Sequence, residues 1–197
     1  NVNNKHIKNQ IQNHNFLSKI IKVNKQDDSI FLKKINNSYF QTKGNKENLL
    51  FVIEIAKILD IKKKNLLKVL NKFKGLKYRQ EIIFKSKDLT IINDSKATSF
   101  SASTSVLESM TNIFWIVGGL VKKGDKLILS KSTSKNLKAY IFGKNRSTFT
   151  KEFKGRVGYE SFVNLKILIK KVFLDIKRST NQNHKTILFS PAAASFD

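Results

Sequence analysis

Short apolar runs separated by polar or glycine-containing segments dominate the chain from Glu81 onward. Four of these runs are mostly β-branched or aromatic, which predicts strands at 89–92, 113–117, 139–142 and 186–189. Before the last run, an amphipathic pattern around 160–177 predicts a long helix with a shared solvent face formed by Lys166, Lys170 and Lys177. Strands that alternate with helices favour a Rossmann-like α/β fold with a mostly parallel sheet.

Two helices are predicted in the first 75 residues. One covers 47–59, where the polar residues Glu47, Glu54 and Lys57 share a face. Its apolar residues are expected to face a core: Leu50, Phe51, Ile55 and Ile58. The next helix has apolar residues at positions i, i+3, i+4 and i+7, namely Leu66, Val69, Leu70 and Phe73. Gly75 is expected to end it.

The first forty residues are rich in Asn and Lys, with short apolar runs at 20–21 and 30–32. This spacing predicts two or three strands joined by polar turns, with a turn at Asn36-Asn37. The pattern changes near Gly75-Leu76, which predicts a domain boundary. We therefore expect an incomplete domain over 1–75 and a nearly complete α/β domain over 76–197.

Polar or glycine-containing segments follow each of the four predicted strands, at 93–98, 118–125, 143–146 and 190–197. Ligands of α/β sheets bind beyond the carboxyl ends of the strands, so these segments predict a crevice. The segment after the first strand contains Asp94, Ser95, Lys96 and Thr98. Alternatively, Asp94 or Ser95 caps the next helix, and these residues alone favour neither interpretation. No GxGxxG follows any strand, so the common dinucleotide fingerprint is absent.

Composition restricts the possible functions. The 197 residues can form one large or two small domains, and 38 Lys and Arg against 14 Asp and Glu give a net charge of +24. A nucleic-acid-binding module would need clustered cations and exposed stacking aromatics. Here the cations are spread along the chain, Lys, Asn, Ile and Phe are enriched together as in an A/T-rich genome, and most of the 15 Phe occupy core-like positions.

Neither a thiolate metal site nor a disulfide is possible, because the chain has no Cys. The three His residues lack metal-ligand spacing, and no apolar run is long enough to cross a bilayer. With no signal peptide visible, a soluble cytoplasmic protein is expected. Because the sequence lacks an initial Met and stops directly after a motif, we also expect a fragment.

Four motifs resemble those of the Mur ligases, in the family's order. They are Gly-Asn-Lys-Glu-Asn at 44–48, Phe-Lys-Gly-Leu-Lys-Tyr-Arg-Gln-Glu at 73–81, Asn-Asp-Ser-Lys-Ala-Thr at 93–98 and Ser-Pro-Ala-Ala-Ala-Ser-Phe-Asp at 190–197. Gly118-Gly119 with Lys122 is similar to the family's Gly-Gly-x-x-Lys. The motif at 93–98 has Asp-Ser-Lys where sibling ligases have a His-containing motif, which favours the branch that adds D-glutamate.

This resemblance implies an ATP-dependent ligase of peptidoglycan precursor synthesis, which joins D-glutamate to UDP-N-acetylmuramoyl-L-alanine through an acyl phosphate. Residues 1–75 would be the tail of its α/β ATPase domain, and 76–197 the domain that binds the incoming amino acid. The phosphate-binding loop, the Mg²⁺ ligands and a modified lysine would lie upstream, so the expected cofactors are ATP and Mg²⁺. A monomer without a nucleic-acid or membrane partner is expected.

The resemblance also implies residue roles. Lys96 would be catalytic and reach the ATP phosphates when the domains close. The nucleotide would also contact Asn45, Asn48, Arg79 and Asp94, the first two at the adenine. D-glutamate would contact Thr98, Lys122, Ser195 and Phe196. The motifs depart from the family at Gly44, where His is usual, and at Lys77-Tyr78, where Pro-His is usual.

Simpler interpretations exist for several of these residues. Asn45 and Asn48 could cap a helix, Arg79 could be a surface cation, and Ser195 could cap a C-terminal helix. Lys123 and Lys126 compete with Lys122 for its role. The competing functions are another Mur-type or folylpolyglutamate ligase, a basic nucleic-acid-binding module, and a degenerate inactive domain.

Overall fold

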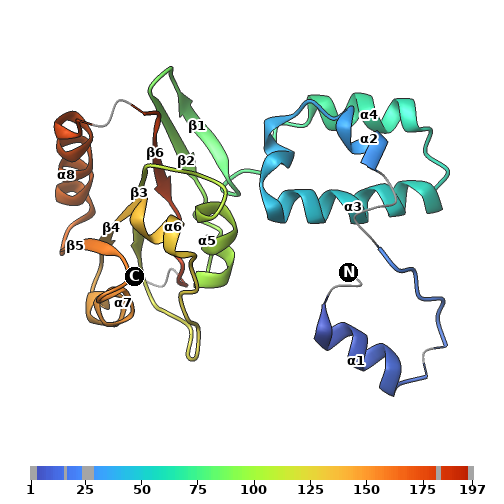
Figure 1. The fold of residues 1–197 in the computed structure, drawn as a ribbon, viewed down its shortest axis with the longest axis horizontal. Helices are drawn as coiled ribbons and strands as arrows, with labels where there is room; N and C mark the ends of the chain where they lie inside the picture. The colour runs from blue at the N-terminus through green and yellow to red at the C-terminus, as the bar shows by residue number, and fades with distance from the viewer. Residues whose placement is uncertain (1–3, 16, 24–28, 181–182, 195–197) are drawn as a thin grey trace. The chain divides into compact units, whose positions relative to one another are not determined.

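The computed structural model describes residues 4–15, 17–23, 29–180 and 183–194. The chain divides into two compact units, Asn1–Lys74 and Gly75–Asp197 (Figure 1). The first is helical in its described residues, and the second contains the sheet. Each is considered separately below.

The helical unit contains α1 (Lys5–Asn13), α2 (Ser29–Lys33), the 3-10 helix η1 (Ser38–Gln41), α3 (Lys43–Ile58) and α4 (Lys63–Lys72). Its core combines buried side chains from all of these except α1: Phe31, Phe40, Leu49, Ile53, Ala56, Leu66 and Leu70. The Thr42 side chain caps α3 by accepting a hydrogen bond from the backbone N–H of Asn45 at 3.3 Å. The helix therefore begins four residues before the predicted start.

The strands predicted in the first forty residues are wrong, because the described part of that segment contains helices and loops but no strand. Asn4 caps α1 through a hydrogen bond from the N–H of Ile7. The run at 30–32 lies in α2, where Phe31 is buried and Ile30 is 75% exposed. Such a short apolar run fits a helix or a strand equally, and the described residues of this unit include no strand to pair with it.

The core face predicted for the first long helix is also largely wrong. Leu50 is buried as expected, but Phe51, Ile55 and Ile58 are exposed. The buried residues are instead Leu49, Ile53 and Ala56, which are spaced by four and three along α3. Both sets have helical periodicity, so the pattern predicted the helix without identifying the face that packs. In α4, Leu66 and Leu70 are buried as predicted, while Val69 is exposed.

The second unit contains one six-stranded sheet, so the α/β fold is confirmed, although only four of these strands were predicted. Its strands are β1 (Glu81–Lys85), β2 (Leu89–Asn93), β3 (Ile113–Gly118), β4 (Leu137–Phe142), β5 (Gly158–Phe162) and β6 (Lys185–Phe189). Their order is β1-β2-β6-β3-β4-β5. Only β1 is antiparallel to its neighbour, and the other pairs are parallel. The mostly parallel sheet is thereby confirmed.

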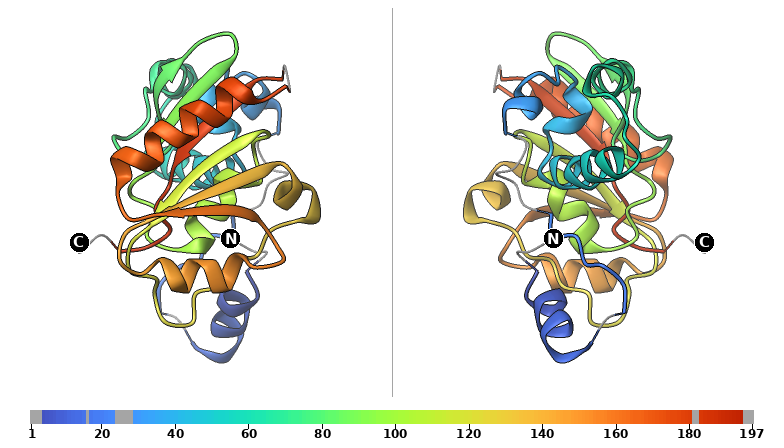
Figure 2. Two further views of the ribbon diagram at one scale, coloured as in Figure 1. Left: turned by 90° about the vertical axis from the view of Figure 1, so that its left-hand side faces the viewer. Right: turned by 90° about the vertical axis from the view of Figure 1, so that its right-hand side faces the viewer.

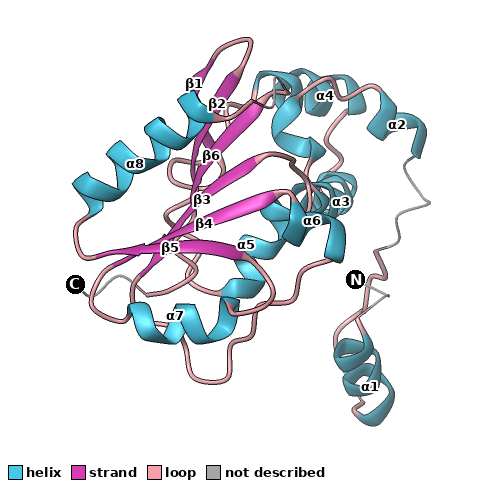
Figure 3. Cartoon of the chain, turned by 60° about the vertical axis from the view of Figure 1, so that its left-hand side comes forward, coloured by secondary structure: helices cyan, strands magenta, loops and turns pink. Residues whose placement is uncertain are grey.

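Helices cover both faces of this sheet (Figures 2 and 3). On one face, α5 (Phe100–Leu107) and α7 (Arg146–Phe153) pack against strand residues such as Trp115 and Leu188. On the other, α8 (Leu165–Arg178) packs Leu168 and Val172 against Tyr140. The short α6 (Lys131–Lys135) precedes β4. None of the described helices is long and apolar enough to cross a membrane.

The predicted helix around 160–177 begins later than expected, because 158–162 forms the edge strand β5. The chain then returns through α8 to β6, which lies between β2 and β3. This crossover matters for the site, because it places the segment after β6 between the segments that follow β2 and β3.

Candidate functional site

The segments that follow β2, β3 and β6 meet at the carboxyl edge of the sheet. We call the residues 94–99, 118–125 and 190–194 the strand-end site. The backbone groups of Leu120 and Ala194 exchange two hydrogen bonds of 3.0 Å, and the N–H of Gly118 donates to the carbonyl of Pro191 at 3.2 Å. The N–H of Asp94 donates to the carbonyl of Phe189 at 2.8 Å. Three predicted motifs are therefore joined by backbone hydrogen bonds where α/β sheets bind ligands.

Asp94 is the buried carboxylate of the strand-end site. Its side chain accepts hydrogen bonds from the backbone N–H of Gln80 at 3.1 Å and from the hydroxyl of Ser190 at 3.0 Å. The Ser190 hydroxyl also contacts the Ser103 hydroxyl at 2.7 Å. Burial raises the pKa of Asp94 to about 6, although these hydrogen bonds and the charge of Arg79 act to lower it. Ser99, and not Asp94 or Ser95, caps the following helix, so the capping alternative is wrong.

This pKa predicts a pH dependence. The folded pKa of about 6 lies above the ordinary aspartate value of 3.8, so the folded state holds the Asp94 proton more tightly than the unfolded state. The contribution of Asp94 to stability should therefore be largest at low pH and fall as pH rises from about 4 to about 6, by about 1 to 3 kcal/mol. Urea denaturation of the wild type and of Asp94→Asn at several pH values tests this. A pH profile that the substitution leaves unchanged would contradict it.

Lys96, Thr98 and Lys122 are exposed at the same edge. The N–H of Lys96 donates to the carbonyl of Tyr78 at 3.1 Å. Its ammonium group makes no hydrogen bond or ion pair with any residue that the structure describes. The ammonium of Lys122 lies 3.4 Å from the hydroxyl of Thr98, whereas Lys126 lies 3.8 Å from a carboxylate oxygen of Glu152. The geometry thus favours Lys122 over Lys126 as the partner of Thr98.

Gly118 and Gly119 allow the segment after β3 to lie close to its neighbours, because neither residue has a side chain. A Cβ atom on Gly118 would lie 2.3 Å from the carbonyl oxygen of Phe142 in the adjacent strand. Gly119 has a φ of +121°, and a Cβ atom there would lie 3.0 Å from the carbonyl oxygen of Ala194. The two glycines are therefore needed for the backbone path that leads to Lys122.

Arg79 belongs to a tight turn that precedes β1. Its N–H donates to the carbonyl of Leu76 at 3.2 Å, and the neighbouring Tyr78 and Gln80 have φ values of 65° and 51°. The side chain of Arg79 is exposed, and its charge acts on Asp94. This turn therefore places a cation near enough to the buried carboxylate to lower its pKa.

The remaining predicted residues are distributed differently. Asn45 is buried in the helical unit and donates through its side-chain amide to the carbonyl of Tyr39 at 2.7 Å, while Asn48 is exposed. Neither of them caps α3, because Thr42 does. Ser195 and Phe196 lie outside the described residues. No group of three or more His, Cys, Asp or Glu among the described residues could hold a metal ion.

Ser190 and Gln80 were not predicted as site residues, although both contact Asp94. Ser190 is the first residue of the motif at 190–197 and directly follows β6, so its position was a usable signal. Gln80 acts through its backbone N–H, which its residue type could not reveal.

Comparison with solved structures finds the same fold in parts of two larger proteins. No family model matches the chain. The chain is similar to the structure of MurF from Acinetobacter baumannii, with a TM-score of 0.55 at 12% identity over 77% of this chain and 35% of that one. It is also similar to the folylpolyglutamate synthase of Mycobacterium tuberculosis, with a TM-score of 0.56 at 10% identity over 78% of this chain and 38% of that one. At these identities the likeness shows the fold alone.

The sequence relatives are more specific. The chain is 33% identical over 176 residues to the UDP-N-acetylmuramoylalanine–D-glutamate ligase of the Wolbachia of Brugia malayi, covering 87% of this chain and 35% of that protein. It is 35% identical over 157 residues to the enzyme of the same name from Francisella tularensis, covering 78% and 36%. Over the matched residues, the chain is therefore similar to ligases of this name. It spans about a third of the length of these relatives.

Proposed function

We propose that this chain is part of an ATP-dependent ligase that adds D-glutamate to UDP-N-acetylmuramoyl-L-alanine in the cytoplasm, for peptidoglycan synthesis. Residues 76–197 would bind the amino acid, and 1–75 would be the tail of the ATP-binding domain. The observation that carries the proposal is the contact between Lys122 and Thr98, beside the pairing of Leu120 with Ala194. The names of the sequence relatives support D-glutamate as the amino acid.

D-glutamate carries two carboxylates, so its pocket needs donors that converge on negative charge. The ammonium of Lys122 offers three donors, and the Thr98 hydroxyl, which accepts from Lys122, still has its own hydrogen to donate. The 3.4 Å contact between them is long for a hydrogen bond, so a carboxylate can replace it at small cost. Ser195 and Phe196 would complete the pocket, because they directly follow Ala194 in the chain.

The reaction needs positive charge at a transferring phosphoryl group. The terminal carboxylate of the UDP-sugar substrate attacks the γ-phosphorus of ATP, and ADP leaves. The amine of D-glutamate then attacks the acyl phosphate, and phosphate is expelled. Lys96, whose ammonium makes no hydrogen bond or ion pair within the described residues, would stabilise the charge on the phosphoryl oxygens. Mg²⁺ would neutralise the ATP phosphates through ligands that we expect upstream of residue 1.

The nucleotide would contact Arg79 and Asp94, and also Asn48 and Asn45. The Asp94 oxygens already accept two hydrogen bonds but have lone pairs left for ribose hydroxyls. Asn48 is exposed and can reach an adenine edge through its amide. Asn45 donates to the Tyr39 carbonyl, so it would act mainly by fixing the start of α3.

Kinetics of the full-length enzyme test the amino-acid pocket. Lys122→Ala and Thr98→Ala should each raise the Michaelis constant for D-glutamate, by about tenfold or more for Lys122, because a charged hydrogen bond to the substrate is lost. The Michaelis constant for ATP should change less than twofold. Lys123→Ala is the matched control, since Lys123 is an exposed neighbouring lysine. Equal changes for both substrates, or an equal effect of Lys123→Ala, would reject this pocket.

A further inference from the structure

A second concave region lies at the amino-terminal edge of the sheet, opposite the strand-end site. It has a volume of about 430 Å³, within the usual range for small-molecule sites. The residues around it come from the starts of β3, β4 and β6 and from the C-terminal ends of α6 and α8. We call it the basic cavity and define it by these lining residues: Asn112, Lys135, Asn136, Lys138, Arg178 and Lys185.

The charge of the basic cavity is strongly positive. Four cationic side chains line it, and Asp175 is the single carboxylate among its lining residues. Asp175 already accepts hydrogen bonds from Lys138 at 2.8 Å, from Lys171 at 2.7 Å and from the Tyr140 hydroxyl at 2.8 Å. Burial acts to raise the pKa of Asp175, but these three donors hold it well below its usual range. The negative charge of Asp175 is therefore already matched by Lys138 and Lys171, and it is not available to Lys135 or Arg178.

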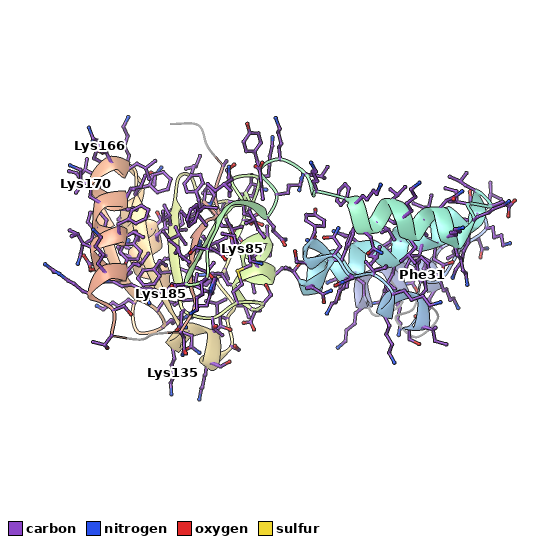
Figure 4. The ribbon with its side chains drawn as sticks, turned by 90° about the horizontal axis from the view of Figure 1, so that it is seen from above. Phe31, Lys85, Lys135, Lys166, Lys170 and Lys185 are labelled. Atoms are coloured by element: carbon purple, nitrogen blue, oxygen red, sulfur yellow. The ribbon has the colours of Figure 1, made fainter. Side chains whose placement is uncertain are left out.

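Two of these cations are available for a ligand. Lys135 ends α6 and Arg178 ends α8, and neither makes a hydrogen bond or ion pair with any described residue. Figure 4 shows Lys135 and Lys185 on the same side of the α/β unit. A guanidinium offers a planar fork of donors that matches phosphate oxygens, and nearby ammonium groups add charge. The cavity therefore has the donor set that a phosphate group needs.

The inner wall of the basic cavity is apolar. Ile113, Phe114 and Leu137 line it beside the cations. Phe114 stacks on the ring of Tyr140, with centroids 6.2 Å apart. A ligand with an apolar part beside its phosphates would fit this combination. A nucleic-acid strand fits it less well, because no fully exposed aromatic ring lines the cavity for base stacking.

We propose that the basic cavity binds the phosphate groups of a small phosphorylated metabolite, at a site separate from the strand-end site. Inorganic pyrophosphate is a suitable probe, because it carries phosphate groups without a base or a sugar. Titrated into the 197-residue chain in 150 mM NaCl and followed by amide NMR, it should shift the resonances of Asn112, Asn136 and Ser179. K135Q/R178Q should weaken this binding at least about tenfold, since the charge-assisted contacts are lost.

K166Q/K170Q is the matched control, because it removes the same charge from the exposed side of α8. Lys166 lies about 18 Å along the helix from Arg178, and Figure 4 shows Lys166 and Lys170 at the other end of the unit from Lys135. This variant should change the affinity less than twofold. Equal weakening in both variants would mean general attraction to a chain of charge +24 and would overturn the proposal. Shifts confined to the strand-end site, or an oligonucleotide that displaces pyrophosphate with higher affinity, would overturn it too.

Discussion

Lys96→Ala should lower the turnover of the full-length ligase by about a thousandfold while leaving the fold intact. A cation at the transferring phosphoryl group contributes on the order of 10³-fold or more in related chemistry, which corresponds to about 4 kcal/mol of transition-state stabilisation. Lys96 is exposed, its backbone N–H donates to the Tyr78 carbonyl, and its ammonium makes no hydrogen bond or ion pair with any described residue. Its side chain therefore contributes little to folding, and the loss should fall on the chemical step.

The measurement is phosphate release under saturating substrates, with denaturation of each variant as the check on folding. Lys96→Arg keeps the charge and should recover part of the activity, which a purely structural role would not predict. Lys166→Ala, an exposed lysine on α8, is the control for the loss of one surface charge. Turnover of Lys96→Ala at the wild-type level would disprove the role assigned to Lys96.

The carboxyl edge of the sheet could be predicted from the sequence because each of the four predicted strands is marked twice. The strand itself is a β-branched or aromatic run, and the polar or glycine-containing segment after it marks its end. A parallel arrangement then brings those ends to one edge. That rule brings together the segments of Lys122 and Thr98, which are 24 positions apart, while the choice of these two residues came from the resemblance.

The sequence could not predict which of several periodic faces is buried. In α3, Phe51 and Ile55 are as apolar as Leu49 and Ile53, and only tertiary packing separates the exposed pair from the buried pair. The edge strand β5 was assigned to a helix, because its residues are half-exposed and carry no clear alternation. Backbone donors such as the N–H of Gln80 could not be predicted either, because every residue type except proline has this group.

The requirement for glycine at position 118 can be tested by measuring the free energy of unfolding. Gly118 ends β3 and pairs in register with Phe142 of β4. In Gly118→Ala, the new Cβ atom would lie 2.3 Å from the carbonyl oxygen of Phe142 and 2.8 Å from a carbon of its ring. Because the first clash is with backbone, the two strands must move apart. We expect a loss of about 3 kcal/mol or more, at or above the upper end of the usual cost of overpacking.

Gly158→Ala is the matched control, because Gly158 begins β5 and a Cβ atom there would meet no other atom within 4 Å. That substitution should be neutral or slightly stabilising, since it restricts the unfolded chain. Urea denaturation followed by the fluorescence of Trp115 reports on the α/β unit alone, because this is the only tryptophan and it is fully buried there. Trp115 also donates to the Ser190 carbonyl at 2.8 Å, so its signal senses the strand-end site directly. If the two alanine variants unfold at the same urea concentration, then the close contact between β3 and β4 at Gly118 does not require glycine, and the prediction is wrong.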